Sequence, residues 1–234
     1  MAGLVLGGRR LGCSCFNVAN PCSALKGDSV VFIGRALANG GEGSGSGPSR
    51  VLVEEWLVNA PTEQREIEID TAAGTSCYTK LTVGERYVIY AQRREISGRQ
   101  RLMIAPCSAT FLVRGKELLA DALKNAARGG QARVVGLVLQ IGKDPRLTAM
   151  AGAQVVIDSG SNRYVASADS KGSYEIRGIA PGRYQLEVTR SGYESEPLYN
   201  GDTSNGVLDR QGYFTVQDGA CAVLNLGLWL VKRE

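Results

Sequence analysis

Residues 169–188 read DSKGSYEIRGIAPGRYQLEV, and this stretch predicts two short β-strands. Side chains alternate between polar and apolar from Ser173 to Ile176 and again from Arg183 to Val188, which is the pattern of strands with one buried face. Pro181-Gly182 predicts a tight turn between them, because proline fixes φ at the first corner and glycine can take a positive φ at the second.

The same pattern extends through the second half of the chain, at residues 134–139, 153–157 and 222–231. Short strands joined by turns at this spacing are typical of a β-sandwich. We therefore expect residues 132–234 to form one β-sandwich domain, closed by the strand at 222–231.

Strand patterns also fill the first half of the chain, at residues 29–37, 51–57, 65–70, 84–91 and 101–104. The first of these is apolar almost throughout, as in a strand buried on both faces, and the third alternates with period two. Five or six strands in this length predict a small closed barrel or a sandwich.

One segment, residues 116–128, changes to helical spacing. Its apolar residues at that spacing are Leu118, Leu119, Ala122, Leu123 and Ala126. Gly129-Gly130 predicts the end of this helix. We expect the helix to pack on the strands before it and to close a first domain that spans residues 13–128. The predicted fold class is therefore mainly β.

Composition narrows the function classes. The chain has 234 residues, a net charge of +4 and no histidine. Without histidine, a Ser-His-Asp or Cys-His relay is excluded, as are the histidine-bearing zinc and non-haem iron sites. Basic residues are scattered among acidic ones and do not form the clustered basic patch that is typical of nucleic-acid-binding proteins. We expect no enzyme activity, no cofactor and no metal bound by the chain alone, while chemistry by a pair of carboxylates stays open.

Six cysteines lie at positions 13, 15, 22, 77, 107 and 221. Their even number and wide spacing predict a disulfide framework in an oxidising compartment, and the alternative is buried free thiols in a cytosolic protein. No stretch approaches the ~20 apolar residues of a membrane span. Leu4-Val5-Leu6 is too short for the apolar core of a secretory leader, so we expect a leader upstream of this start or a remnant of one. The expected location is secreted, extracellular or periplasmic.

Landmarks along residues 13–128 follow a recognisable order. Cys13-Ser14-Cys15 and Cys22 come first, then DSVVFIGR at residues 28–35, Cys77, VGERYVIYA at residues 83–91, Cys107-Ser108-Ala109-Thr110 and the helix. This order resembles the netrin-like domains, among them the tissue inhibitors of metalloproteinases and their bacterial relatives. The resemblance implies an OB-like five-stranded barrel with one packed C-terminal helix.

The same resemblance implies disulfides from Cys13 to Cys77 and from Cys15 to Cys107. In the inhibitors, the free α-amine and carbonyl of the first cysteine bind the zinc of the protease, and the next side chain, here Ser14, enters its specificity pocket. The implied inhibitory ridge is Cys13, Ser14, Cys15 and Phe16. It requires a mature chain that starts at Cys13, because an amide nitrogen does not ligate zinc. In an unprocessed chain, the only role expected of Cys13 and Cys15 is to form structural disulfides.

The stretch at 169–188, with its D-x-x-G-x-Y and P-G-x-Y patterns, resembles the carboxypeptidase regulatory-like domains. These are immunoglobulin-like or transthyretin-like β-sandwiches, including the Cna-B-like repeats of bacterial surface proteins. The resemblance covers about residues 132–234 and implies a spacer, stalk or adhesion platform. Asp169 is either a calcium ligand or a turn residue, and the turn is favoured because Asp bonds its own backbone before glycine.

Cys22 and Cys221 remain, and elimination pairs them with each other, which would tie the first domain to the last strand of the second. We therefore predict a non-catalytic, secreted or surface-associated binding or adhesion module of two disulfide-stapled β domains. Its expected partner is an extracellular protein. The alternative function is inhibition of a zinc metalloproteinase through a freed Cys13.

Overall fold

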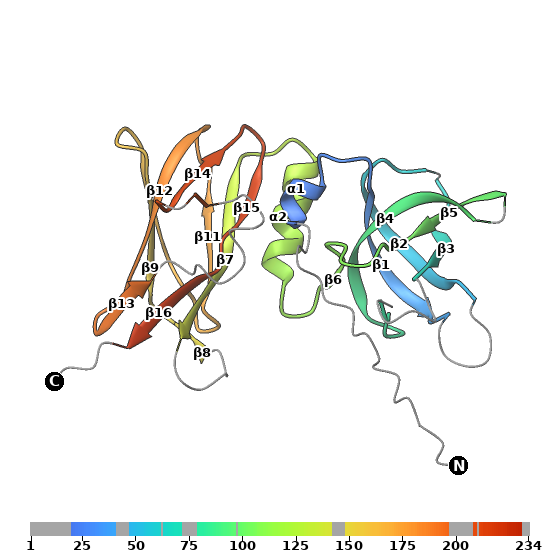
Figure 1. The fold of residues 1–234 in the computed structure, drawn as a ribbon, viewed down its shortest axis with the longest axis horizontal. Helices are drawn as coiled ribbons and strands as arrows, with labels where there is room; N and C mark the ends of the chain where they lie inside the picture. Colours follow the sequence, from blue (N-terminus) through green and yellow to red (C-terminus); the bar gives the residue numbers. More distant parts are fainter. Residues whose placement is uncertain are drawn as a thin grey trace, which may run out of the picture.

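The computed structural model describes residues 20–40, 47–61, 63–71, 79–96, 98–141, 148–196, 208–209 and 211–230. Over these residues the chain forms a β-barrel and a β-sandwich, and the helices α1 (Pro21–Ala24) and α2 (Glu117–Ala127) lie between them (Figure 1). The prediction of a mainly β protein is confirmed, and the short helix α1 is an addition to the one helix predicted. No helix in the part described is long and apolar enough to cross a membrane.

The barrel is built from the first strands of the chain. They are β1 (Val30–Ala38), β2 (Ser49–Val58), β3 (Glu66–Asp70), β4 (Arg86–Ile96), β5 (Arg99–Met103) and β6 (Phe111–Leu112). Their order is β1-β2-β3-β5-β4, and β4 pairs again with β1, so five strands close into a barrel while β6 lies beside β4. Pairing is antiparallel except between β3 and β5, which run parallel. Of the two architectures expected for this half, the closed barrel is correct.

Both faces of β1 are buried, as its apolar sequence predicted. Phe32 belongs to the cluster inside the barrel and packs edge-to-face on Trp56, with ring centroids 5.1 Å apart. Val31 and Ile33 belong to a second cluster on the other face, which they share with Leu123 of α2. Burial of this second cluster holds α2 against the barrel.

The helix α2 follows the predicted segment 116–128 closely. It ends at Ala127, and Gly129, just beyond the C-cap Arg128, takes a φ of +68° that an L side chain adopts only with strain. Glu55 of β2 pairs with Lys124 at 3.2 Å and with Arg128 at 2.6 Å. These ion pairs fix the helix along the outside of β2.

The second half of the chain forms the predicted β-sandwich. Its strands are β7 (Arg133–Ile141), β8 (Thr148–Ala149), β9 (Gln154–Asp158), β10 (Arg163–Ser167), β11 (Ser173–Arg177), β12 (Gly182–Thr189), β13 (Tyr193–Glu196), β14 (Tyr213–Val216), β15 (Cys221–Val223) and β16 (Leu226–Leu230). One sheet has the order β10-β9-β12-β14 and the other β11-β7-β16-β13, with β8 and β15 also paired to β7. Tyr174, Tyr184 and Ile157 are fully buried in the core between the sheets.

The closing strand predicted at 222–231 is in fact two strands, β15 and β16, both parallel to β7. The ladder breaks at Leu224 and Asn225. The hydroxyl of Tyr174 donates to the Leu224 carbonyl at 2.7 Å, and the N–H of Leu137 donates to the Asn225 side chain at 3.1 Å. Side-chain hydrogen bonds thus replace part of the backbone ladder, which explains the break.

The turn predicted at Pro181-Gly182 is also different. Gly182 is the first residue of β12, where it pairs with Val216, and it is not among the residues with positive φ. The positive φ lies earlier, at Gly178, with a value of +66°. The chain therefore bends at Gly178, directly after β11, and crosses to the other sheet, where Gly182 has the extended backbone of a strand.

Candidate functional site

A disulfide closes the junction between the barrel and the sandwich. Cys22 of α1 is bonded to Cys221 of β15, 199 residues away, and their Cα atoms lie 5.4 Å apart. Elimination among the cysteines led to the same pair. The bond joins the start of the barrel to the last part of the sandwich.

The short helix α1 is held in place by specific bonds at its start. Asn20 caps it by accepting the N–H of Cys22 at 2.9 Å, and Pro21 occupies the first helical position. Tyr90 of β4 donates its hydroxyl to the Pro21 carbonyl at 2.7 Å. Burial raises the pKa of Tyr90 above its ordinary value, so the hydroxyl remains a donor even in mildly alkaline solution. These bonds set the position from which Cys22 meets β15.

A second contact between the two units is centred on Arg133, the first residue of β7. Its guanidinium donates to Asp121 at 2.8 Å and Asn125 at 3.2 Å on α2, and to Glu175 at 3.1 Å on β11. Only 16% of the Arg133 side chain and 11% of the Glu175 side chain are exposed. Because these charges are largely removed from water, loss of one partner is strongly destabilising. Arg133 therefore fixes the sandwich against α2.

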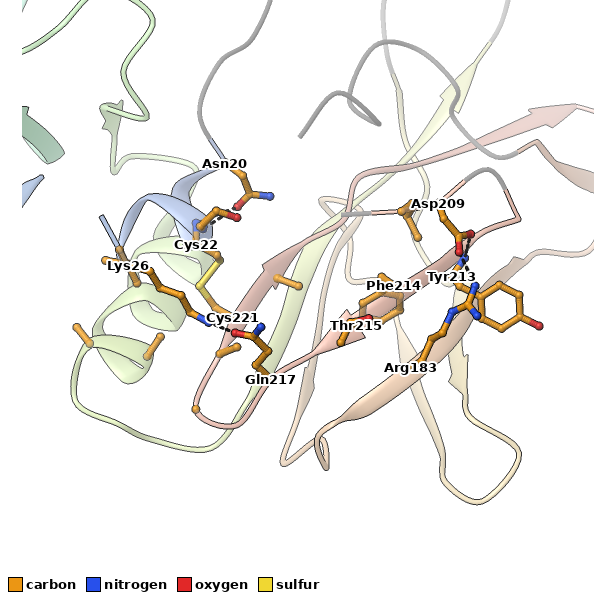
Figure 2. Close-up of a pocket in the computed structure, with 18 of the residues that line it drawn as sticks. Asn20, Cys22, Lys26, Arg183, Asp209, Tyr213, Phe214, Thr215, Gln217 and Cys221 are labelled. Carbon is orange, nitrogen blue, oxygen red and sulfur yellow. Dashed lines mark hydrogen bonds and ion pairs between the residues drawn. A yellow bond between two sulfur atoms is a disulfide. The ribbon is translucent and has the colours of Figure 1, made fainter. Parts of the chain in front are cut away.

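A cleft of about 770 Å³ opens beside the disulfide, between α1 with the end of α2 on one side and β14 with its neighbouring loops on the other (Figure 2). Figure 2 shows the disulfide at one end of the cleft and Arg183, Asp209 and Tyr213 at the other. Lys26 donates across the cleft to Gln217. The volume lies within the usual range of ligand pockets, and we call this feature the junction cleft.

The far end of the junction cleft carries a fixed ion pair. Arg183 donates to Asp209 at 2.6 Å, and its guanidinium lies 4.4 Å from the ring centroid of Tyr213. The other oxygen of Asp209 accepts the N–H groups of Gln211 and Tyr213, both at 2.9 Å. The Tyr213 N–H above all, followed by Arg183, lowers the pKa of Asp209 below its ordinary value. Asp209 is thus an anion, and both of its carboxylate oxygens accept hydrogen bonds, so it is poorly suited to transfer protons near neutral pH.

The described lining of the junction cleft offers hydrogen-bonding and apolar groups. Asp209 is the one carboxylate among the lining residues that the structure describes. Carboxylate catalysis needs two opposed acids, and the described lining does not form such a pair. Within the same part of the chain, no three Cys, Asp or Glu residues gather closely enough to hold a metal ion. The hydrogen-bonding and apolar groups that do line the cleft are of the kind that binding pockets contain.

Most of the sequence-predicted site falls outside the described residues. This holds for the whole inhibitory ridge, Cys13, Ser14, Cys15 and Phe16, and for Cys77. Cys107 is disulfide-bonded. The pairings of Cys13 with Cys77 and of Cys15 with Cys107 stay predictions.

Asp169, weighed as a calcium ligand or a turn residue, is a turn residue. One of its carboxylate oxygens accepts the N–H groups of Lys171 at 2.8 Å and Ser173 at 2.9 Å. This local bonding is what Asp typically supplies in turns.

The junction cleft was not predicted from the sequence, although the sequence contains a pattern that marks one of the turns beside it. Asp209 and Gly212 repeat the D-x-x-G spacing of Asp169 and Gly172, and both glycines have a positive φ. In each copy the Asp carboxylate accepts the N–H groups two and four residues ahead. Recognising this repeat would have placed a second turn before β14. The cleft residues before position 30 carry no comparable pattern.

Comparison with solved structures finds only weak likenesses. The minor pilin of Streptococcus agalactiae is 12% identical with a TM-score of 0.31, covering 88% of this chain and 84% of that chain. Chlorocatechol 1,2-dioxygenase from Pseudomonas putida is 12% identical with a TM-score of 0.26, covering 42% of this chain and 59% of that chain. The Bacillus anthracis TIE protein is 12% identical with a TM-score of 0.31, covering 88% of this chain and 27% of that chain. The chain thus spans less than two thirds of the last two proteins, and these scores do not establish a shared fold.

Sequence comparison is more informative for the second half of the chain. No curated protein matches the chain. Residues 134–205 match the carboxypeptidase regulatory-like domain family. This match lies within the β-sandwich and supports a carboxypeptidase regulatory-like domain as the C-terminal part of the chain.

Proposed function

We propose that this chain is a non-catalytic, secreted or surface-associated binding and adhesion module in which barrel and sandwich act as one rigid body. The observation that carries the proposal is the Cys22–Cys221 disulfide across the junction. Disulfides of this kind persist in oxidising compartments, which favours an extracellular or periplasmic location. The expected partner is an extracellular protein.

Rigidity at the junction supports an adhesive role. The disulfide fixes β15 to α1, and the Arg133 contacts fix β7 and β11 to α2. Two modules held at a constant angle lose less conformational freedom on binding than two modules on a flexible linker. A fixed angle also presents the junction cleft to a partner in one shape.

The junction cleft is the surface we propose for the partner. Its far end exposes Arg183, whose side chain is 60% accessible, stacked on Tyr213. Arg and Tyr are among the residue types that contribute most to protein–protein binding. Lys26 and Gln217 add polar groups where the two walls of the cleft meet.

The finer description of the fold belongs to the same proposal. We propose that the barrel is OB-like, as in the netrin-like domains, and that the chain divides into domains at about 13–128 and 132–234. The strand order β1-β2-β3-β5-β4 with its return to β1, together with the parallel pair β3 and β5, supports an OB-like topology. Separate cores around Ile89 in the barrel and Tyr184 in the sandwich support the division.

The test uses the organism that produces the protein. We expect added protease to cleave the protein on intact cells, or the protein to be found in the medium. We also expect a deletion strain to attach less than its parent to plastic coated with plasma proteins, and the wild-type gene to restore attachment. Complementation with Arg183→Ala should restore it at least about fivefold less well, which corresponds to a loss of about 1 kcal/mol of binding free energy, as for an interface residue that contributes measurably.

Arg50→Ala is the matched control for this test. Arg50 is an exposed arginine on the barrel and pairs with Glu66 at 3.1 Å, much as Arg183 pairs with Asp209. The control should restore attachment fully. A protein protected inside intact cells, or a deletion strain that attaches like its parent, would overturn the proposal.

A further inference from the structure

The strand β10 lies at an edge of the sheet β10-β9-β12-β14, and β14, which lines the junction cleft, lies at the opposite edge. β10 pairs with β9 along its whole length, from Arg163 opposite Asp158 to Ser167 opposite Gln154. Exposed edges are commonly protected by proline, by a bulge or by charges along the strand. β10 has the sequence RYVAS and contains no proline. Its pairing with β9 has no bulge, and its only charged residue, Arg163, is its first residue.

The direction of the backbone groups of β10 follows from the bonds just beyond its two ends. The Asn162 carbonyl accepts the N–H of Ser159 at 3.0 Å, and the N–H of Ala168 donates to the Ala153 carbonyl at 2.8 Å. Residues 162 and 168 therefore point their backbone groups toward β9. In an antiparallel pair this direction alternates from residue to residue, so residues 164 and 166 also point toward β9.

The free edge of β10 consequently presents the N–H and C=O groups of Arg163, Val165 and Ser167. Within the described residues β10 pairs with β9 alone, so these groups have no hydrogen-bonded partner strand there, although β11 of the other sheet lies close to β10. The side chain of Val165 is apolar and 55% exposed. The middle of the edge is therefore open to solvent and able to accept another strand.

We propose that this edge pairs with the same edge of a second copy of the chain, antiparallel, about a two-fold axis at Val165. In this register Val165 lies opposite Val165 of the second copy, and Arg163 lies opposite Ser167 of the second copy. Each pair is of the kind that exchanges two backbone hydrogen bonds, so all the outward groups of β10 find partners together. The two four-stranded sheets then form one continuous sheet, an isologous dimer.

The charges of β10 are compatible with this register. The two Arg163 side chains would stand at opposite ends of the pairing, four residues or about 13 Å apart along the strand direction. That separation exceeds the ~10 Å screening length at 0.1 M salt. Within its own chain, each Arg163 lies 3.7 Å from Asp158.

Apolar contact at the axis supplies the driving force. Val156 of β9 lies opposite Val165 within the chain and is 6% exposed. Pairing would place the two Val165 side chains together and create an apolar row of four valines across the joined strands. Burial of an exposed β-branched side chain against its equivalent is a favourable cross-strand pair. The exposed Val165 at the centre of this register, and the placement of the two Arg163 charges at its opposite ends, favour a second copy over an extended segment of another protein.

Sedimentation equilibrium of the purified, oxidised chain tests the proposal, over protein concentrations from about 1 μM to about 1 mM. We expect a monomer–dimer equilibrium. Val165→Lys should raise the dissociation constant at least about tenfold, because it places two ammonium groups opposite each other and removes the valine contact. Val165→Thr keeps the β-branched shape and should change the constant less than about threefold. Far-UV circular dichroism and the urea midpoint check that both variants fold.

Amide hydrogen exchange measured by NMR gives a readout specific to β10. The amides of Arg163, Val165 and Ser167 should become protected as the concentration rises, whereas those of Tyr164 and Ala166 should be protected throughout. A chain that stays monomeric over the whole range, or a dimer that folded Val165→Lys does not weaken, would overturn the proposal. Pairing of an unrelated extended peptide with a strictly monomeric chain would also overturn it and assign the edge to another protein.

Discussion

Opening the Cys22–Cys221 disulfide should uncouple the barrel from the sandwich. The bond spans 199 residues, and for a loop of this length the chain-entropy model assigns about 5 kcal/mol of stabilisation at 25 °C. Removal of native disulfides is generally observed to destabilise by about 2–5 kcal/mol. We therefore expect the double variant Cys22→Ala with Cys221→Ala to lose free energy of unfolding within that range.

Two tryptophans allow the two units to be followed separately, since Trp56 lies in β2 and Trp229 in β16. Urea unfolding should be recorded by fluorescence in Trp56→Phe and Trp229→Phe backgrounds. With the disulfide closed, both probes should report one transition, and with it open the midpoints should separate. Each single cysteine variant breaks the same bond, so the double variant should be no less stable than either single one. A loss below about 1 kcal/mol with coincident midpoints would refute the reasoning.

Three further predictions concern single side chains. Gly136→Ala should lower the free energy of unfolding by about 3 kcal/mol or more in urea titrations, since its Cβ would lie 1.7 Å from the Leu224 carbonyl oxygen. Gly47→Ala, with nothing within 4 Å, is its control and should change little. Tyr174→Phe should lose about 1–3 kcal/mol in the same assay, because the Leu224 carbonyl loses a 2.7 Å donor, and an unchanged midpoint would contradict this. Asp209 has a folded-state pKa below its ordinary 3.8, so its stabilisation is complete above about pH 4 and is lost as the pH falls through the folded-state value. Asp209→Asn should therefore flatten the acid limb of melting temperature against pH, and equal acid limbs in variant and wild type would argue against this role.

The main strands could be predicted because their buried faces produce a regular period. In β12, Tyr184 and Val188 are buried, Leu186 is half-buried, and the residues between them are exposed. The stripe of α2 is equally regular, and Gly129 marks its end through a backbone conformation that other residues avoid. Where apolar residues recur at the period of a strand or a helix, the element can be predicted from the sequence alone.

The elements that escaped prediction lack such a period in their sequence, even where, as in β10, the burial itself alternates. β10 is an edge strand with exposed Val165 on one face, so its apolar residues do not alternate with polar ones. The run that forms β15 and β16 is apolar except for Asn225, and that single polar residue was the sign of the break. The junction cleft brings together residues near position 20 and residues near position 220, and only long-range packing determines that contact.

The junction and the free edge of β10 lie on opposite edges of one sheet of the sandwich, so we expect them to act independently. β14 borders the junction cleft and β10 lies three strand spacings away, about 14 Å across the sheet. Sites at that distance with no shared contacts usually contribute independently. Val165→Lys should therefore leave the stability of the junction unchanged, and opening the Cys22–Cys221 bond should leave the dimer dissociation constant unchanged. If opening that bond instead weakened the dimer, the position of the barrel would have to contribute to self-association, and the rigid junction would then serve assembly as well as binding.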